Sequence, residues 1–138
     1  MSGSARESRK FRILLATPRY HELEEFVFAL AREEHDPVTV GSGNDALDLV
    51  ASLSPDLVIV DEGLPDREPL DLVREIAGLN ARVNTAVITD LNKEEFHAGS
   101  EGLGVLCSLP GKPGAEEASR LVRKMACLLP QSESVITG

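Results

Sequence analysis

Short apolar runs alternate with amphipathic stretches along most of the chain. The most apolar run, Leu57–Val60, is rich in β-branched residues and lies between Pro55 and Gly63. A run this short predicts a strand buried on both faces of a sheet, because a buried helix needs about ten residues or more. Asp61 follows the run directly, so the pattern places a carboxylate at the carboxyl end of a central strand.

Apolar residues before and after this run predict four more strands and five helices. The other strands are expected at Phe11–Ala16, Val38–Val40, Thr85–Thr89 and Val105–Leu109. Helical spacing of apolar residues predicts helices across Tyr20–Glu34, Ala46–Ala51, Pro69–Gly78, Lys93–His97 and Ala118–Leu129. Because strands and helices alternate and crossovers are right-handed, we expect an α/β fold with a five-stranded parallel sheet, doubly wound, with helices on both faces.

The length and the apolar content indicate one domain. The chain has 138 residues, of which 42% are hydrophobic and only 4% aromatic. These values predict a single domain over residues 11–129 with a core of Leu, Val, Ile and Ala, and flexible tails at 1–10 and 130–138. Cys107 and Cys127 have no CxxC spacing, so we expect both to be small buried side chains.

Charge and hydropathy exclude some classes of partner. The net charge of −9 argues against direct nucleic-acid binding, because phosphate contacts need clustered Lys and Arg. No apolar segment approaches the ~20 residues that a membrane span needs, and Met1–Lys10 lacks the apolar core of a signal peptide. We therefore expect a cytoplasmic protein that contacts neither membrane nor nucleic acid.

Three polar residues follow predicted strands and should meet at one edge of the sheet. Asp61 comes after the third strand, Thr89 ends the fourth, and Lys112 comes after the fifth. Ligands of open α/β sheets bind at this edge. A carboxylate, a hydroxyl and an ammonium together could accept and stabilise a phosphoryl group.

With these residues the sequence resembles a known family. The matching segments are Asp56–Asp61 followed by Leu64 and Pro65, Val87–Thr89, Lys112 with Pro113, and Gly43–Leu47. In this combination the chain resembles the receiver domain of two-component response regulators, which has a flavodoxin-like fold. The resemblance implies that Asp61 is the phospho-acceptor, that Thr89 and Lys112 contact phosphate, and that Asp61 and the Gly63 carbonyl would help to hold Mg²⁺.

Two departures from the family pattern concern the metal. The acidic pair that follows the first strand in receivers is replaced by Thr17 and Pro18. Mg²⁺ is usually bound by one or two carboxylates and by phosphate oxygens, so we expect Asp61 alone to bind it weakly. Asp90 stands where receivers have a small residue. It could be a metal ligand, a group that repels phosphate, or a loop carboxylate without a site role.

Further departures concern the switch and the cations. The aromatic switch residue of receivers should fall at Ser108 or Leu109, and neither is aromatic. Lys112 is expected to be the only full positive charge near Asp61. The acidic residues Glu22, Glu24 and Glu25 are expected to face solvent on the first helix, and the alternative is that one of them is a metal ligand.

Three hypotheses about function remain at this point. The first is a stand-alone atypical receiver that is not an enzyme, binds no cofactor and acts as a protein-interaction module without Mg²⁺-dependent phosphorylation. Its partners would be a histidine kinase or a downstream effector, with a possible homodimer through the faces of the fourth and fifth helices. The second is a phosphorylatable receiver with a modified metal site that Asp90 or a first-helix Glu completes. The third is an unrelated flavodoxin-like protein that binds a ligand.

Overall fold

The computed structural model describes residues 12–32 and 37–128, so the expected tails 1–10 and 130–138 lie outside the described residues. The strands are β1 (Ile13–Ala16), β2 (Val38–Val40), β3 (Leu57–Asp61), β4 (Asn84–Ile88) and β5 (Val105–Leu109). The helices are the 3-10 helix η1 (Tyr20–Leu23) and the α-helices α2 (Glu24–Arg32), α3 (Gly43–Leu53), α4 (Pro69–Leu79), α5 (Lys93–Ser100) and α6 (Ala115–Leu128).

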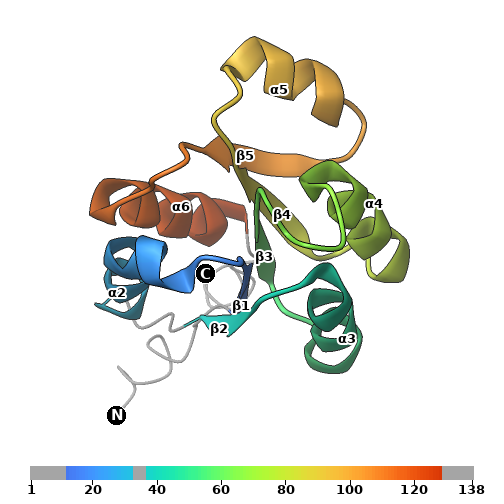
Figure 1. Cartoon of the computed structure of the whole chain (residues 1–138), viewed down its shortest axis with the longest axis horizontal. Coiled ribbons are helices and arrows are strands. Elements are labelled where there is room, and N and C mark those ends of the chain that lie inside the picture. Colours follow the sequence, from blue (N-terminus) through green and yellow to red (C-terminus); the bar gives the residue numbers. More distant parts are fainter. Residues whose placement is uncertain (1–11, 33–36, 129–138) are drawn as a thin grey trace, which may run out of the picture.

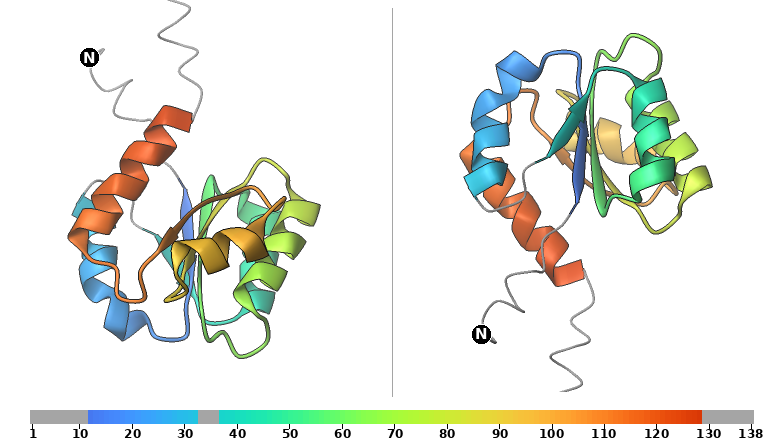
Figure 2. Two further views of the ribbon diagram at one scale, coloured as in Figure 1. Left: turned by 90° about the horizontal axis from the view of Figure 1, so that it is seen from above. Right: turned by 90° about the horizontal axis from the view of Figure 1, so that it is seen from below.

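The strands form one parallel sheet in the order β2-β1-β3-β4-β5. This is the flavodoxin-like order, in which the chain direction across the sheet reverses between β1 and β3. The α-helices α2 and α6 cover one face of the sheet, and α3, α4 and α5 lie on the other (Figures 1 and 2). The predicted fold class is therefore confirmed.

Strand β3 lies at the centre of two apolar cores. All five of its residues are buried. Leu57 and Ile59 pack with α2 and α6, whereas Val58 and Val60 pack with α3, α4 and Phe96 of α5. Because alternate side chains of a strand point to opposite faces, a continuous apolar run is what a central parallel strand requires.

Local capping explains where several helices begin. The side chain of Ser42 accepts a hydrogen bond from the amide of Asp45 at the start of α3, at 3.1 Å. Asn92 and Glu95 form a capping box at the start of α5. Pro69 occupies the first position of α4, where its missing N–H costs nothing.

Two expectations need correction. The first predicted helix is not continuous over its described residues, because the 3-10 turn η1 precedes α2. Cys127 is exposed, whereas Cys107 is partly buried in β5, and burial raises the pKa of its thiol. The prediction that Cys127 is buried was wrong because the end of α6 projects beyond the sheet (Figure 2).

No helix among residues 12–32 and 37–128 has the length and apolarity of a membrane span.

Candidate functional site

Asp61 is fully buried at the carboxyl end of β3, and its carboxylate is already paired. The hydroxyl of Thr17, just past β1, donates to Asp61 Oδ2 at 2.7 Å. The guanidinium of Arg19 donates from Nε to Oδ2 at 2.8 Å and from Nη2 to Oδ1 at 2.9 Å. Both carboxylate oxygens therefore accept hydrogen bonds, and one full positive charge lies against them.

Arg19 makes further contacts that hold it in this position. Its Nη2 donates to the carbonyl of Gly111, in the loop between β5 and α6, at 2.6 Å. Its Nη1 lies 3.5 Å from Glu22 Oε1, a more exposed contact. The hydrogen bonds to Asp61 raise the pKa of Arg19 above its ordinary value. A planar guanidinium suits this two-point contact because its N–H groups form a rigid fork.

Arg19 is the site residue that the sequence reasoning missed. Lys112 was expected to be the only cation near Asp61, and that expectation was wrong because Arg19 pairs with Asp61 directly. Lys112 is exposed, and within the described part of the chain it forms neither a hydrogen bond nor an ion pair. The available signal was position alone: Arg19 follows Thr17 and Pro18 at the end of β1, which neighbours β3.

The residues around Asp61 do not fit a Mg²⁺ ion. Thr17 offers a hydroxyl and no carboxylate, and this hydroxyl donates a hydrogen bond to Asp61. The nearest additional charge is the Arg19 guanidinium, which would repel a cation. Glu22, Glu24 and Glu25 are exposed, as expected, and Glu22 contacts Arg19. Within residues 12–32 and 37–128 no cluster of three His, Cys, Asp or Glu residues could hold a metal.

The predicted phosphate contact Thr89 has a different partner. Thr89 is buried just past β4, and its hydroxyl donates to a carboxylate oxygen of Glu62. The same hydroxyl accepts a hydrogen bond from the amide of Leu91 at 3.1 Å. Thr89 thus lies beside Glu62, the residue that follows Asp61. The single hydroxyl hydrogen of Thr89 is used in the hydrogen bond to the Glu62 carboxylate.

Asp90 binds a loop. Its Oδ1 accepts a hydrogen bond from the amide of Gly111 at 3.0 Å, which ties the end of β4 to the loop after β5. A Cβ atom at Gly111 would lie 2.3 Å from Asp90 Oδ1, so this close approach requires glycine. Of the three interpretations of Asp90, the loop carboxylate matches these contacts.

Ser108 and Leu109 point to opposite faces of β5. Ser108 pairs in register with Val87, whose face also carries Thr89 two residues later. Leu109 is buried in the other core, against α2 and α6. Of the two candidate switch positions, Ser108 therefore shares the face of Thr89, and it has no ring to rotate.

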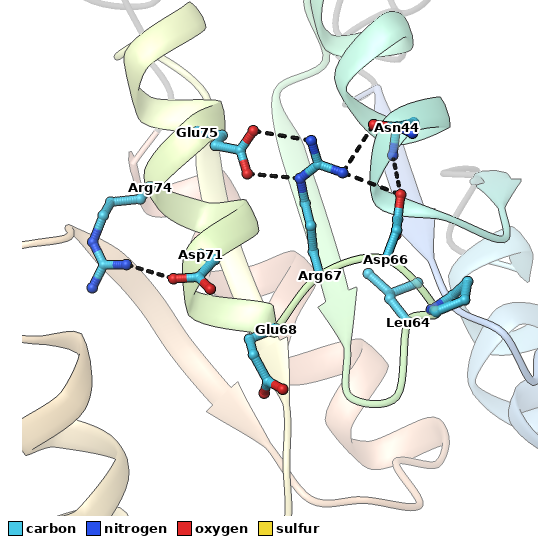
Figure 3. A pocket seen from close by; sticks show the side chains of 9 residues that line it. Asn44, Leu64, Asp66, Arg67, Glu68, Asp71, Arg74 and Glu75 are labelled. Carbon is cyan, nitrogen blue, oxygen red and sulfur yellow. Dashed lines mark hydrogen bonds and ion pairs between the residues drawn. The ribbon is translucent and has the colours of Figure 1, made fainter.

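The segment after Asp61 is held by a charged network at α3 and α4 (Figure 3). Asp66 accepts hydrogen bonds from the amides of Gly43 at 2.8 Å and Asn44 at 3.0 Å, which lowers the pKa of Asp66. Arg67 pairs with Glu75, with its Nε 2.6 Å from Oε2, and also donates to Asn44 Oδ1 at 2.9 Å. Asp66 is thus an additional cap of α3 supplied by a distant loop.

Gly63 lies in the turn between Asp61 and this network. Its φ of +83° falls in the left-handed region that favours glycine. The turn brings Gly63 near Pro18, whose Cγ would lie 3.8 Å from a Cβ atom on the glycine. The role of the Gly63 carbonyl as a metal ligand, which the family resemblance implies, stays a prediction.

Comparison with known proteins supports the fold. No protein-family model matches the chain. The receiver domain protein of Methanospirillum hungatei JF-1 superposes with a TM-score of 0.74 at 17% identity, covering 84% of this chain and 94% of that one. The receiver domain of the putative response regulator NarL from Mycobacterium tuberculosis gives 0.74 at 16% identity, covering 87% of this chain and 98% of that one.

A longer protein, NtrX from Brucella abortus, also superposes, with a TM-score of 0.75 at 18% identity over 86% of this chain. The match spans only 28% of the NtrX chain. The first two of these neighbours are response regulator receiver domains. At these identities the likeness establishes a receiver-like fold.

Proposed function

We propose that this protein is an atypical receiver that acts as a protein-interaction module without Mg²⁺-dependent aspartyl phosphorylation. The observation that carries the proposal is the two-point ion pair between Arg19 and buried Asp61. This pair supplies, from within the chain, the positive charge that a metal ion would otherwise bring to the carboxylate.

The chemistry of phosphoryl transfer supports this proposal. An oxygen of Asp61 would have to attack phosphorus, and its hydrogen bonds from Arg19 and Thr17 draw electron density from it and make it a weaker nucleophile. The hydroxyl proton of Thr89, which the family resemblance assigns to phosphate, is already donated to Glu62. Lys112 lacks an ion pair among the described residues, so it is the one expected contact that remains available.

The Arg19 contacts also favour one fixed conformation of the edge that carries Asp61. Arg19 joins the end of β1 to the end of β3 and to the loop after β5. The expected switch position on β5 carries Ser108, which is not aromatic, so no ring can rotate there. We infer that output arises from docking of a partner and that the protein is not an enzyme.

The partner is proposed to be a protein of a two-component system, either a histidine kinase or an effector. A homodimer through α5 and α6 stays a prediction, as does a cytoplasmic location. Side chains of α5 and α6, among them Lys93 and Arg120, line a groove along β5 that offers a surface for either contact.

Intact-mass analysis after incubation with acetyl phosphate and Mg²⁺ tests the proposal. We expect no phosphoryl adduct on the wild-type protein. A phosphoryl adduct that disappears in Asp61→Asn would overturn the proposal and support the phosphorylatable alternative. Asp66→Asn is the matched control, because Asp66 is a nearby carboxylate at the edge of the same loop that pairs with backbone amides.

A further inference from the structure

A small pocket opens beside Thr89, apart from the Arg19–Asp61 pair. It lies between the segment after β3, the start of α4, and the segment from β4 to α5, and its volume is about 270 Å³. Its lining combines apolar side chains with two carboxylates, Glu62 and Glu68. The chemistry of this lining indicates what it would bind.

The two carboxylates have no cation partner in the part of the chain that the structure describes. Glu68 is the N-cap residue of α4, but its side chain makes no capping hydrogen bond. Figure 3 shows Glu68 turned away from the network of Arg67 and Glu75. Glu62 accepts a hydrogen bond from Thr89, which is a neutral donor. Neither the N-terminus of α4 nor the Thr89 hydroxyl supplies a full positive charge to these two carboxylates.

The rest of the pocket is apolar. Val87 and Phe96 are buried, at 1% and 7% exposure, and Leu70 is partly buried. Leu91, which also lines the pocket, is 50% exposed. An apolar wall that ends in water-facing carboxylates suits a ligand with an aliphatic stem and a cationic head.

We propose that this pocket receives a lysine or arginine side chain of a protein partner. The aliphatic stem lies along Leu70, Phe96 and Leu91, and the charged group pairs with Glu62 and Glu68. A metal ion fits less well, because the pocket offers two carboxylates beside an apolar wall, and a metal needs more oxygen ligands. The proposal rests on the proposed function only in taking the partner to be a protein.

The test is a titration of the full chain with N-acetyl-lysine methylamide, followed by NMR of the backbone amides. We expect saturable shifts at Gly63, Leu70 and Leu91, with a dissociation constant in the millimolar range. N-acetyl-norleucine methylamide, which has the stem without the ammonium, should bind severalfold more weakly. Glu68→Gln should weaken lysine binding about two- to fivefold, as expected for a partly exposed ion pair.

Two further variants complete the test. Leu91→Ser should also weaken binding, because it removes part of the apolar wall. Glu94→Gln is the matched control, since Glu94 is an exposed carboxylate of α5 outside this pocket, and it should bind like the wild type. Arg19 and Asp61 are unchanged in all variants, so failure here leaves the phosphorylation test of the proposed function unaffected.

Four results of the probe titrations would overturn the inference. They are absence of saturable shifts, equal binding of the norleucine probe, unchanged lysine binding in Glu68→Gln, and an equal loss in Glu94→Gln. Shifts at the same amides on raising the protein concentration without a probe would assign the pocket to a second copy of this chain and would also overturn the proposal of a different partner.

Discussion

The guanidinium of Arg19 donates to both carboxylate oxygens of Asp61, a residue 42 positions later in the chain. Because Arg19 also donates to the Gly111 carbonyl, one side chain joins the segment after β1 to the last residue of β3 and to the loop after β5. The guanidinium of Arg19 thereby holds together the carboxyl edge of the sheet. We expect the stability of this edge and its affinity for Mg²⁺ to depend on Arg19.

Replacing Arg19 should lower the free energy of unfolding. Arg19→Ala leaves Asp61 buried without its cation, and we expect a loss of about 2–4 kcal/mol, measured by urea denaturation. Arg74→Ala is the matched control, because Arg74 pairs with Asp71 on the surface, where such pairs contribute at most about 1 kcal/mol. Equal losses in the two variants would contradict a special role of Arg19.

Reversing the charge at position 19 should create an affinity for Mg²⁺. In Arg19→Asp a second carboxylate lies near Asp61, so the variant should be destabilised without the ion and should gain thermal stability when Mg²⁺ is added. The wild-type protein should show no change in its melting temperature. Arg19→Ala separates the gain of a ligand from the loss of the guanidinium, and an equal response of wild type and Arg19→Asp would count against the idea.

The hydroxyl of Thr17 should matter more than its methyl group. It donates to Asp61 Oδ2 and accepts from the amide of Arg19 at 3.1 Å, and Thr17 is 4% exposed. Thr17→Val keeps the shape but removes both hydrogen bonds, so we expect a loss of about 1–3 kcal/mol in denaturant titrations. Thr17→Ser keeps the hydroxyl and should lose less than Thr17→Val.

Asp90 and Gly111 should be coupled. In Gly111→Ala the new methyl group displaces the Asp90 carboxylate and breaks its hydrogen bond, at a cost of about 1–2 kcal/mol. Asp90→Ala removes the same bond, so the double variant should lose less than the sum of the single losses. Gly78→Ala, in a helix with open space around the position, should be neutral or stabilising. Additive losses at 90 and 111 would refute the contact.

Lowering the pH should reduce the free energy of unfolding, in part through Asp66 in the loop that follows Asp61. Backbone hydrogen bonds from Gly43 and Asn44 lower the pKa of Asp66. A carboxyl whose pKa is lower in the folded state contributes stability above its unfolded pKa of about 4, and this contribution is lost as the pH falls through the folded value. Urea midpoints between neutral and acidic pH should therefore fall less steeply in Asp66→Asn than in the wild type.

Glu75 acts in the same direction, because its contact with Arg67 also lowers its pKa. In the double variant Asp66→Asn/Glu75→Gln, the urea midpoint should therefore depend on pH even less than in Asp66→Asn alone. An acid limb of the stability curve that is unchanged in both variants would show that other carboxyl groups control it.

The fold and part of the site could be predicted because they depend on local patterns. Apolar periodicity distinguishes strands from helices, and alternation of the two leads to a parallel sheet whose strand ends share one edge. The position of Asp61 at this edge follows from that pattern, as does the neighbourhood of Thr89. Capping of α5 by Asn92 and the place of Pro69 at the start of α4 are local features as well.

What only the tertiary structure decided is which long side chain reaches which group. Arg19 and Lys112 both follow strands at the same edge, and nothing in their sequence positions tells which cation pairs with Asp61. The outcome depends on distances across the sheet and on competing acceptors such as the Gly111 carbonyl. The partner of a flexible charged side chain is a property of three-dimensional proximity, whereas the period of apolar residues is a property of the chain itself.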